Sequence, residues 1–158
     1  MSGEILNVHV SDLISLCSKE VKGSNPIDTF FSKILFSYRS VFFDERYKTV
    51  KEHELRSIID FYKDIIESNK LHYEKDYFDC DDFALVFKSI ASSHFNTNAI
   101  GIALGLVVLP DGRYGMHAWN VAVTDNKEIL HIEPQLFEIV KNNVSSDKFK
   151  YYLKWVIW

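Results

Sequence analysis

The sequence predicts an α+β fold in which N-terminal helices pack on a C-terminal antiparallel sheet. Apolar residues recur at helical spacing over about the first 95 residues, and at strand spacing over about 96–158. Helices followed by a run of strands are typical of the α+β class. No linker, repeat or low-complexity tract stands out, and 158 residues is an ordinary domain length. We therefore expect one domain over residues 1–158.

Four helices are expected in the first part, beginning near Ser11, Pro26, Glu52 and Cys80. Asn25 is a suitable N-cap for the second helix, because it precedes a proline at the first helical position. Apolar side chains between Ile27 and Phe42 recur at helical spacing in this second helix, so we expect it to lie in the core. The fourth helix places Asp79-Cys80-Asp81-Asp82 at or near its N-terminus.

Four strands are expected in the second part, over Ile100–Val108, Gly115–Val123, Glu128–Gln135 and Phe149–Trp158. Asp125-Asn126 is the expected hairpin turn between the second and third strands. With Asp125 at the centre of that turn, His117 lies opposite Glu133, and Trp119 lies opposite His131. Side chains directly opposite each other on antiparallel strands approach closely enough to interact.

Composition excludes several classes of protein. The net charge is −4 with 25% charged residues, and no cluster of Lys and Arg indicates a nucleic-acid partner. The longest apolar stretches are too short to span a membrane, and no secretory signal is recognisable at the N-terminus. The chain has two cysteines, Cys17 and Cys80, which suits free thiols in a reducing compartment. We expect a cytoplasmic protein with no membrane or nucleic-acid partner.

Three segments concentrate reactive side chains: Asp79–Asp82, His117–Asn120 and His131–Gln135. A cysteine at a helix N-terminus meets the positive end of the helix dipole, which favours the thiolate. The neighbouring aspartates oppose the thiolate because like charges repel. A cation near Cys80, either protonated His117 or a metal ion, would resolve this conflict.

The order of these residues predicts a cysteine hydrolase. A helix-borne cysteine, a strand-borne histidine and a polar residue on the next strand follow each other in papain-like hydrolases. Cys80 is then the nucleophile that forms a thioester with a peptide or protein substrate, His117 the general base, and Glu133 the residue that orients His117. Gln135 is placed to donate an amide to the oxyanion. Trp119 is expected either to form a lid or wall over the thiol or to lie in the core.

The same motifs resemble one particular family. Tyr77-Phe78-Asp79-Cys80-Asp81-Asp82-Phe83-Ala84, His117-Ala118-Trp119-Asn120 and Glu133-Pro134-Gln135 resemble the papain-like C-terminal catalytic domain of agglutinins of the Marasmius oreades type. The resemblance is confined to Tyr77–Gln135. It implies a cysteine protease that depends on calcium or manganese, with Asp81 and Asp82 as metal ligands beside Glu133. The β-trefoil of those agglutinins does not fit within 158 residues, so targeting of the substrate must differ.

The chemistry of the donors also favours such a metal site. Asp81, Asp82 and Glu133 supply hard oxygen ligands, which suit Ca²⁺ or Mn²⁺ better than zinc. No organic cofactor is expected. The simpler interpretation is that Asp81 and Asp82 only complement the helix dipole.

Two other functions compete with a protease. One is a non-catalytic metal-binding or regulatory protein on the same papain-like scaffold, which the aspartate pair favours. The other is an acyl transferase of the transglutaminase type, which uses the same thiol with an amine acceptor. The identity of the substrate and the oligomeric state are not predicted by the sequence.

Overall fold

The computed structural model describes residues 7–23 and 25–158, so the first six residues, on which the absence of a secretory signal was judged, lie outside the described part. The helices are α1 (Val10–Glu20), α2 (Pro26–Arg39), α3 (Glu52–Ser68) and α4 (Cys80–Phe95). The strands are β1 (Asn7–His9), β2 (Arg46–Lys48), β3 (Ile100–Val108), β4 (Tyr114–Val123), β5 (Ile129–Glu133), β6 (Glu138–Val140) and β7 (Lys150–Ile157). The predicted α+β class is confirmed.

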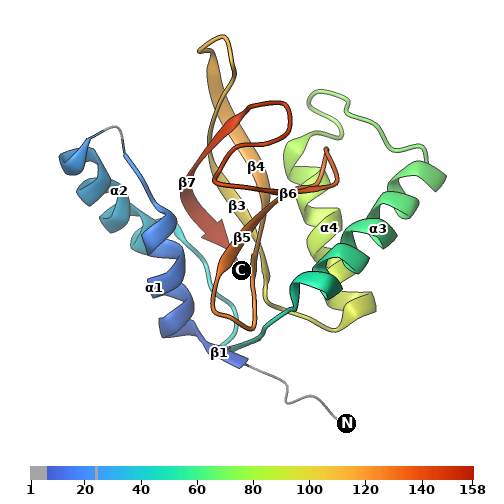
Figure 1. The fold of residues 1–158 in the computed structure, drawn as a ribbon, viewed down its shortest axis with the longest axis horizontal. Coiled ribbons are helices and arrows are strands. Elements are labelled where there is room, and N and C mark those ends of the chain that lie inside the picture. The colour runs from blue at the N-terminus through green and yellow to red at the C-terminus, as the bar shows by residue number, and fades with distance from the viewer. Residues whose placement is uncertain (1–6, 24) are drawn as a thin grey trace.

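One antiparallel sheet of five strands forms the centre, in the order β6-β5-β4-β3-β7. Figure 1 shows α1 and α2 on one side of this sheet, and α3 and α4 on the other. The strands β1 and β2 form a separate two-stranded sheet. Each of β1, β2 and β6 has only three residues, which is too short for an alternating pattern to be recognised in the sequence.

Alternation along β4 sends side chains into core clusters on both faces of the sheet. Trp119 and Val121 belong to the cluster that contains Leu13 of α1 and Phe36 of α2. Ala122 belongs to the cluster beneath α3 and α4. Because neighbouring side chains of a strand point to opposite faces, one central strand supplies both clusters.

The hairpin of β4 and β5 differs from the predicted register by two residues. Val121 pairs with His131, and the turn is closed by a hydrogen bond from the Thr124 N–H to the Glu128 carbonyl at 3.0 Å. Residues 125–127 connect Thr124 to Glu128, and Lys127, the last of the three, has a positive φ of 59°. A shift of two residues leaves each side chain on its expected face, because the period of a strand is two.

Helix α2 begins as predicted but does not lie in the core. The Asn25 side chain accepts a hydrogen bond from the Asp28 N–H at 2.9 Å, and Pro26 is the first helical residue. Only Ser32 and Phe36 of the helix are buried. The expectation that its apolar face packs inside is therefore wrong, because the sheet is contacted by the opposite face of the helix.

Within the described residues, no helix is both long and apolar enough to cross a membrane.

Gly105 occupies an irregularity in the pairing of β3 with β7, and we expect Gly105→Ala to lower the free energy of unfolding by about 2 kcal/mol. An added Cβ would collide with the Tyr152 carbonyl and lie 2.9 Å from the Trp119 ring. The matched control is Gly115→Ala, since nothing lies within 4 Å of a Cβ at that position. Urea unfolding measures both. Equal losses in the two variants would contradict the packing described here.

Candidate functional site

The start of α4 places Cys80 against the central strand β4. Asp79 is the N-cap, and its N–H donates to the Asp82 carboxylate at 3.1 Å in a capping box. Cys80 is partly buried and packs against Ala84 and Ala118. The helix is thus held at both ends of its first turn, which fixes the position of the thiol relative to β4.

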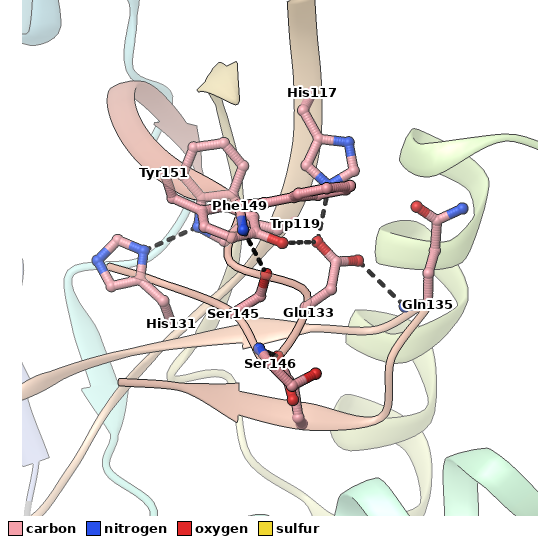
Figure 2. Close-up of polar contacts among 10 residues, drawn as sticks. His117, Trp119, His131, Glu133, Gln135, Ser145, Ser146, Phe149 and Tyr151 are labelled. Carbon is pink, nitrogen blue, oxygen red and sulfur yellow. Dashed lines mark hydrogen bonds and ion pairs between the residues drawn. The ribbon is translucent and has the colours of Figure 1, made fainter. Parts of the chain in front are cut away.

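His117 of β4 joins Cys80 to Glu133. Its Nε2 lies 2.7 Å from the Glu133 carboxylate and donates to it, while a side-chain hydrogen bond links the ring to Cys80. Figure 2 shows the second ring nitrogen on the side away from Glu133. The three residues that the sequence predicted as a group therefore meet, although β4 and β5 pair in a different register from the predicted one.

Glu133 is 2% exposed, and three donors satisfy its carboxylate. His117 and the Tyr151 hydroxyl both bind Oε2, the hydroxyl at 2.9 Å, and the Gln135 N–H donates to Oε1 at 3.1 Å. Figure 2 shows these bonds meeting at the carboxylate. A buried carboxylate is costly unless it is paired and hydrogen-bonded. This network meets both conditions and fixes the orientation of the imidazole.

The electrostatics favour protonated His117. Burial lowers the pKa of His117, but the hydrogen bonds to Cys80 and Glu133 raise it, and the net result is a pKa of about 9. The imidazolium then supplies the positive charge expected beside Cys80. Burial and Glu133 also raise the pKa of Tyr151, which keeps its hydroxyl protonated as a donor.

Trp119 supports the site from beneath. It is fully buried, stacks on His117 with ring centroids 6.1 Å apart, and its Nε1 donates to His131 Nδ1 at 2.8 Å. Of the two expectations for Trp119, a core position is therefore the one that the structure shows, and a wall in contact with a solute is not, because the indole is buried. His131 Nε2 lies 3.8 Å from the Glu20 carboxylate, too far for a hydrogen bond.

Gln135 contributes to the site through its backbone, since its N–H binds Glu133. Its side-chain amide extends away from that carboxylate in Figure 2. The role of the amide at an oxyanion stays a prediction. Tyr151 was missed by the sequence reasoning, because its strand lies 18 residues beyond Glu133 and carries no motif.

The possible metal ligands form a set that differs from the predicted one. Ligand atoms of Asp79, Cys80 and Asp81 all lie within 4.8 Å of one another. Asp82 belongs to the capping box, and Glu133 is occupied by its three donors. Asp81, a predicted metal ligand, therefore belongs to this cluster. Its second carboxylate comes from Asp79, for which the sequence predicted only a position at the helix terminus.

Comparison with known proteins identifies the family. The family model for the ricin-type beta-trefoil lectin C-terminal domain matches residues 19–155. The chain belongs to this family. The agglutinin resemblance predicted from three motifs is confirmed at this broader level. No curated protein matches the chain.

Solved structures share the fold of this lectin C-terminal domain. One, described as the PSL1a-E64 complex, has a TM-score of 0.60 and 18% identity, with 97% of this chain and 51% of that chain covered. The lectin of Polyporus squamosus, bound to the epitope Neu5Aca2-6Galb1-4GlcNAc, has a TM-score of 0.61 and 17% identity, with 97% and 50% covered. The chain thus spans about half the length of these structures.

These findings contradict the predicted cysteine protease, its peptide or protein substrate, and the acyl transferase considered beside it. The matched family is a lectin C-terminal domain, and one solved neighbour is a lectin bound to a carbohydrate epitope. The contacts among Cys80, His117 and Glu133 form as expected, but the function inferred from them is wrong.

We expect Glu133→Gln to lower the pKa of His117 from about 9 towards its ordinary value of 6.5. A pKa raised on folding stabilises the folded state fully below pH 6.5 and loses this contribution as pH rises through 9. The wild type should therefore lose up to about 3 kcal/mol of unfolding free energy over that window, and the variant much less.

NMR titration of the His117 ring protons, with urea unfolding at each pH, measures both effects. His117→Gln assigns the resonance among the six histidines. An unchanged His117 pKa in Glu133→Gln would contradict the role given to this carboxylate.

Proposed function

We propose that residues 1–158 form one domain of a lectin-type, carbohydrate-binding protein, and that this domain binds a divalent cation, Ca²⁺ or Mn²⁺, at the start of α4. The observation that carries the cation site is the cluster of Asp79, Cys80 and Asp81, whose ligand atoms lie within 4.8 Å of one another. A cytoplasmic location and a papain-like layout are part of the proposal. The first is supported by two free cysteines, and the second by Cys80 at the start of α4 facing His117 of β4.

The two carboxylates of the cluster share a hydrogen bond in a way that favours a cation. The bond to Asp79 raises the pKa of Asp81, and the bond from Asp81 lowers the pKa of Asp79. The two carboxylates repel each other when both are ionised. A divalent cation between them would neutralise both charges.

The donor chemistry selects among cations. Two carboxylates beside solvent suit Ca²⁺ and Mn²⁺, which accept further oxygen ligands from water. The Cys80 sulfur is a softer donor that hydrogen-bonds to Asp79 and His117. Zinc would prefer to include the sulfur, so competition between zinc and calcium reports whether the thiol is a ligand.

Carbohydrate binding by this chain is a second candidate, favoured by the family and by one pocket. The pocket has a volume of about 300 Å³. Its lining residues are Lys22, Gly23, Asp28, Leu106, Val108, Tyr114, Tyr152 and Lys154, so two amines outnumber one carboxylate. Aromatic faces and convergent amines are suited to an acidic sugar, because the ring can stack while the amines pair with its carboxylate. The epitope named for the Polyporus squamosus lectin contains such a sugar, Neu5Ac.

We expect Ca²⁺ or Mn²⁺ to raise the melting temperature of chelator-treated protein. A free cation concentration of about 100 times the Kd contributes about 2.7 kcal/mol. Differential scanning fluorimetry and calorimetric titration measure the effect. Asp81→Asn should abolish it, whereas Asp147→Asn, which removes an exposed carboxylate elsewhere, should leave it intact. Binding should also weaken as pH falls, because Asp81 must lose its proton.

No shift at millimolar cation, or equal shifts in the wild type and in Asp81→Asn, would contradict the cation site.

Glycan-array binding of the labelled chain tests the second candidate. We expect retention on glycans that end in Neu5Ac, and loss of that retention in Tyr114→Ala, whose side chain lines the pocket and is exposed. Asp81→Asn is the control that should keep glycan binding. A folded chain that binds no glycan would contradict carbohydrate recognition by this chain.

A further inference from the structure

A polar pocket lies where the end of α4 meets β1 and β2. It has a volume of about 360 Å³, which is within the usual range for small-molecule sites. Its described lining residues are Asn7, Arg46, Lys48, Ser92, Asn96, Thr97 and Asn98, and we call it the β2 pocket. Most ligand pockets are lined mainly by apolar side chains. The described lining of this pocket has two cations and no carboxylate, which indicates a polar, anionic ligand.

The β2 pocket is separate from both sites proposed above. It lies at the end of α4, whereas the cluster of Asp79, Cys80 and Asp81 lies at the start of this helix. The helix has 16 residues, so the two sites are roughly 24 Å apart. Figure 1 shows β1 and the end of α4 at the same end of the molecule. The β2 pocket also shares no lining residue with the pocket that contains Tyr114 and Tyr152.

The side chains of Thr97 and Asn98 hold β2 in place beneath the pocket. The Lys48 N–H donates to Asn98 Oδ1 at 2.7 Å, and Asn98 Nδ2 donates to the Arg46 carbonyl at 3.0 Å. The Thr97 hydroxyl donates to the Lys48 carbonyl at 2.8 Å, and the Trp158 indole donates to the Asn98 carbonyl at 3.0 Å. The backbone that carries the two cations is therefore fixed before a ligand binds, which lowers the entropic cost of binding.

Arg46 and Lys48 carry positive charge that the surrounding chain does not pair. They are two residues apart on one strand, so both side chains lie on the same face, and Tyr47 between them is buried. Neither of the two side chains forms an ion pair within the described residues. The Asp44 carboxylate does not line the pocket, and it accepts a hydrogen bond from Asn98 Nδ2 at 2.9 Å.

The end of α4 contributes charge of the opposite sign, but less of it. Asn96 is the C-cap of this helix, and its N–H donates to the Ala91 carbonyl. The C-terminal end of a helix is equivalent to about half a negative elementary charge. Two full positive charges outweigh this contribution, so the β2 pocket attracts anions.

We propose that the β2 pocket binds a small phosphomonoester with a hydroxylated body, such as a sugar phosphate. The phosphate dianion matches the two cations, because the Arg46 guanidinium can bind two of its oxygens and the Lys48 ammonium a third. A single carboxylate would leave one cation unpaired. The amides of Asn7 and Asn96 and the hydroxyl of Ser92 line the rest of the pocket and suit the hydroxyl groups of the body.

Calorimetric titration with glucose 6-phosphate tests this site. We expect a Kd below about 1 mM, no detectable binding of glucose, and at least tenfold weaker binding of inorganic phosphate. Arg46→Gln and Lys48→Gln should each weaken the binding of glucose 6-phosphate at least tenfold. The matched control is Lys19→Gln, which removes an exposed cation of α1 outside the pocket and should keep the affinity of the wild type.

Two further measurements separate this site from the fold and from the cation site. The contacts of Arg46 and Lys48 with Asn98 and Thr97 use the backbone of β2, so both variants should keep the melting temperature of the wild type. Asp81→Asn should bind glucose 6-phosphate as the wild type does.

The proposal would be overturned by the absence of binding at millimolar glucose 6-phosphate, or by equal weakening in Lys19→Gln and the two pocket variants. Equal affinities for glucose 6-phosphate and inorganic phosphate would rule out recognition of the hydroxylated body. Equally tight binding of glucuronate, which carries a single carboxylate, would rule out selection of a dianion.

Discussion

The buried carboxylate of Glu133 constrains the part of the sheet on which the candidate site depends. It is the meeting point of β4, through His117, and of β7, through the Tyr151 hydroxyl, while the Gln135 N–H closes the turn that follows β5. A carboxylate in this position costs several kcal/mol if it is left unpaired. The three segments must therefore keep their relative positions for the fold to tolerate the charge.

The same carboxylate sets the charge at the start of α4. It holds His117 as an imidazolium next to Cys80, while Asp79 and Asp81 bring negative charge to the other side of the thiol. The interaction between the two aspartates raises the pKa of Asp81 and lowers that of Asp79. A divalent cation would balance their negative charge, and Asp81 is exposed to solvent at the first turn of α4.

Local sequence patterns predicted several contacts of this structure, but they did not predict the hairpin register or the hydrogen bond of Tyr151. The N-cap at Asn25 and the approach of His117 to Glu133 follow from local patterns and from the period of a strand. The hairpin register differed by two residues because the turn is centred on Asn126, between Thr124 and Glu128, and not on Asp125. Tyr151 could not be found, because nothing local to β7 indicates that its hydroxyl meets a carboxylate on β5.

Periodicity also did not show which face of α2 packs inside. An apolar stripe indicates a buried face of some kind, but the burying partner can be the same chain or another one. The error in function has a related cause. The three motifs correctly placed Cys80, His117 and Glu133 together, but contacts of this kind do not decide what a protein acts on. The lectin family was decided by the match along residues 19–155.

Anomalous diffraction from crystals grown with Mn²⁺ tests the proposed cation site most directly. We predict one strong anomalous peak between the carboxylates of Asp79 and Asp81, with His117 still bonded to Glu133. Crystals that show no such peak, or a peak only at distant surface carboxylates, would contradict the account.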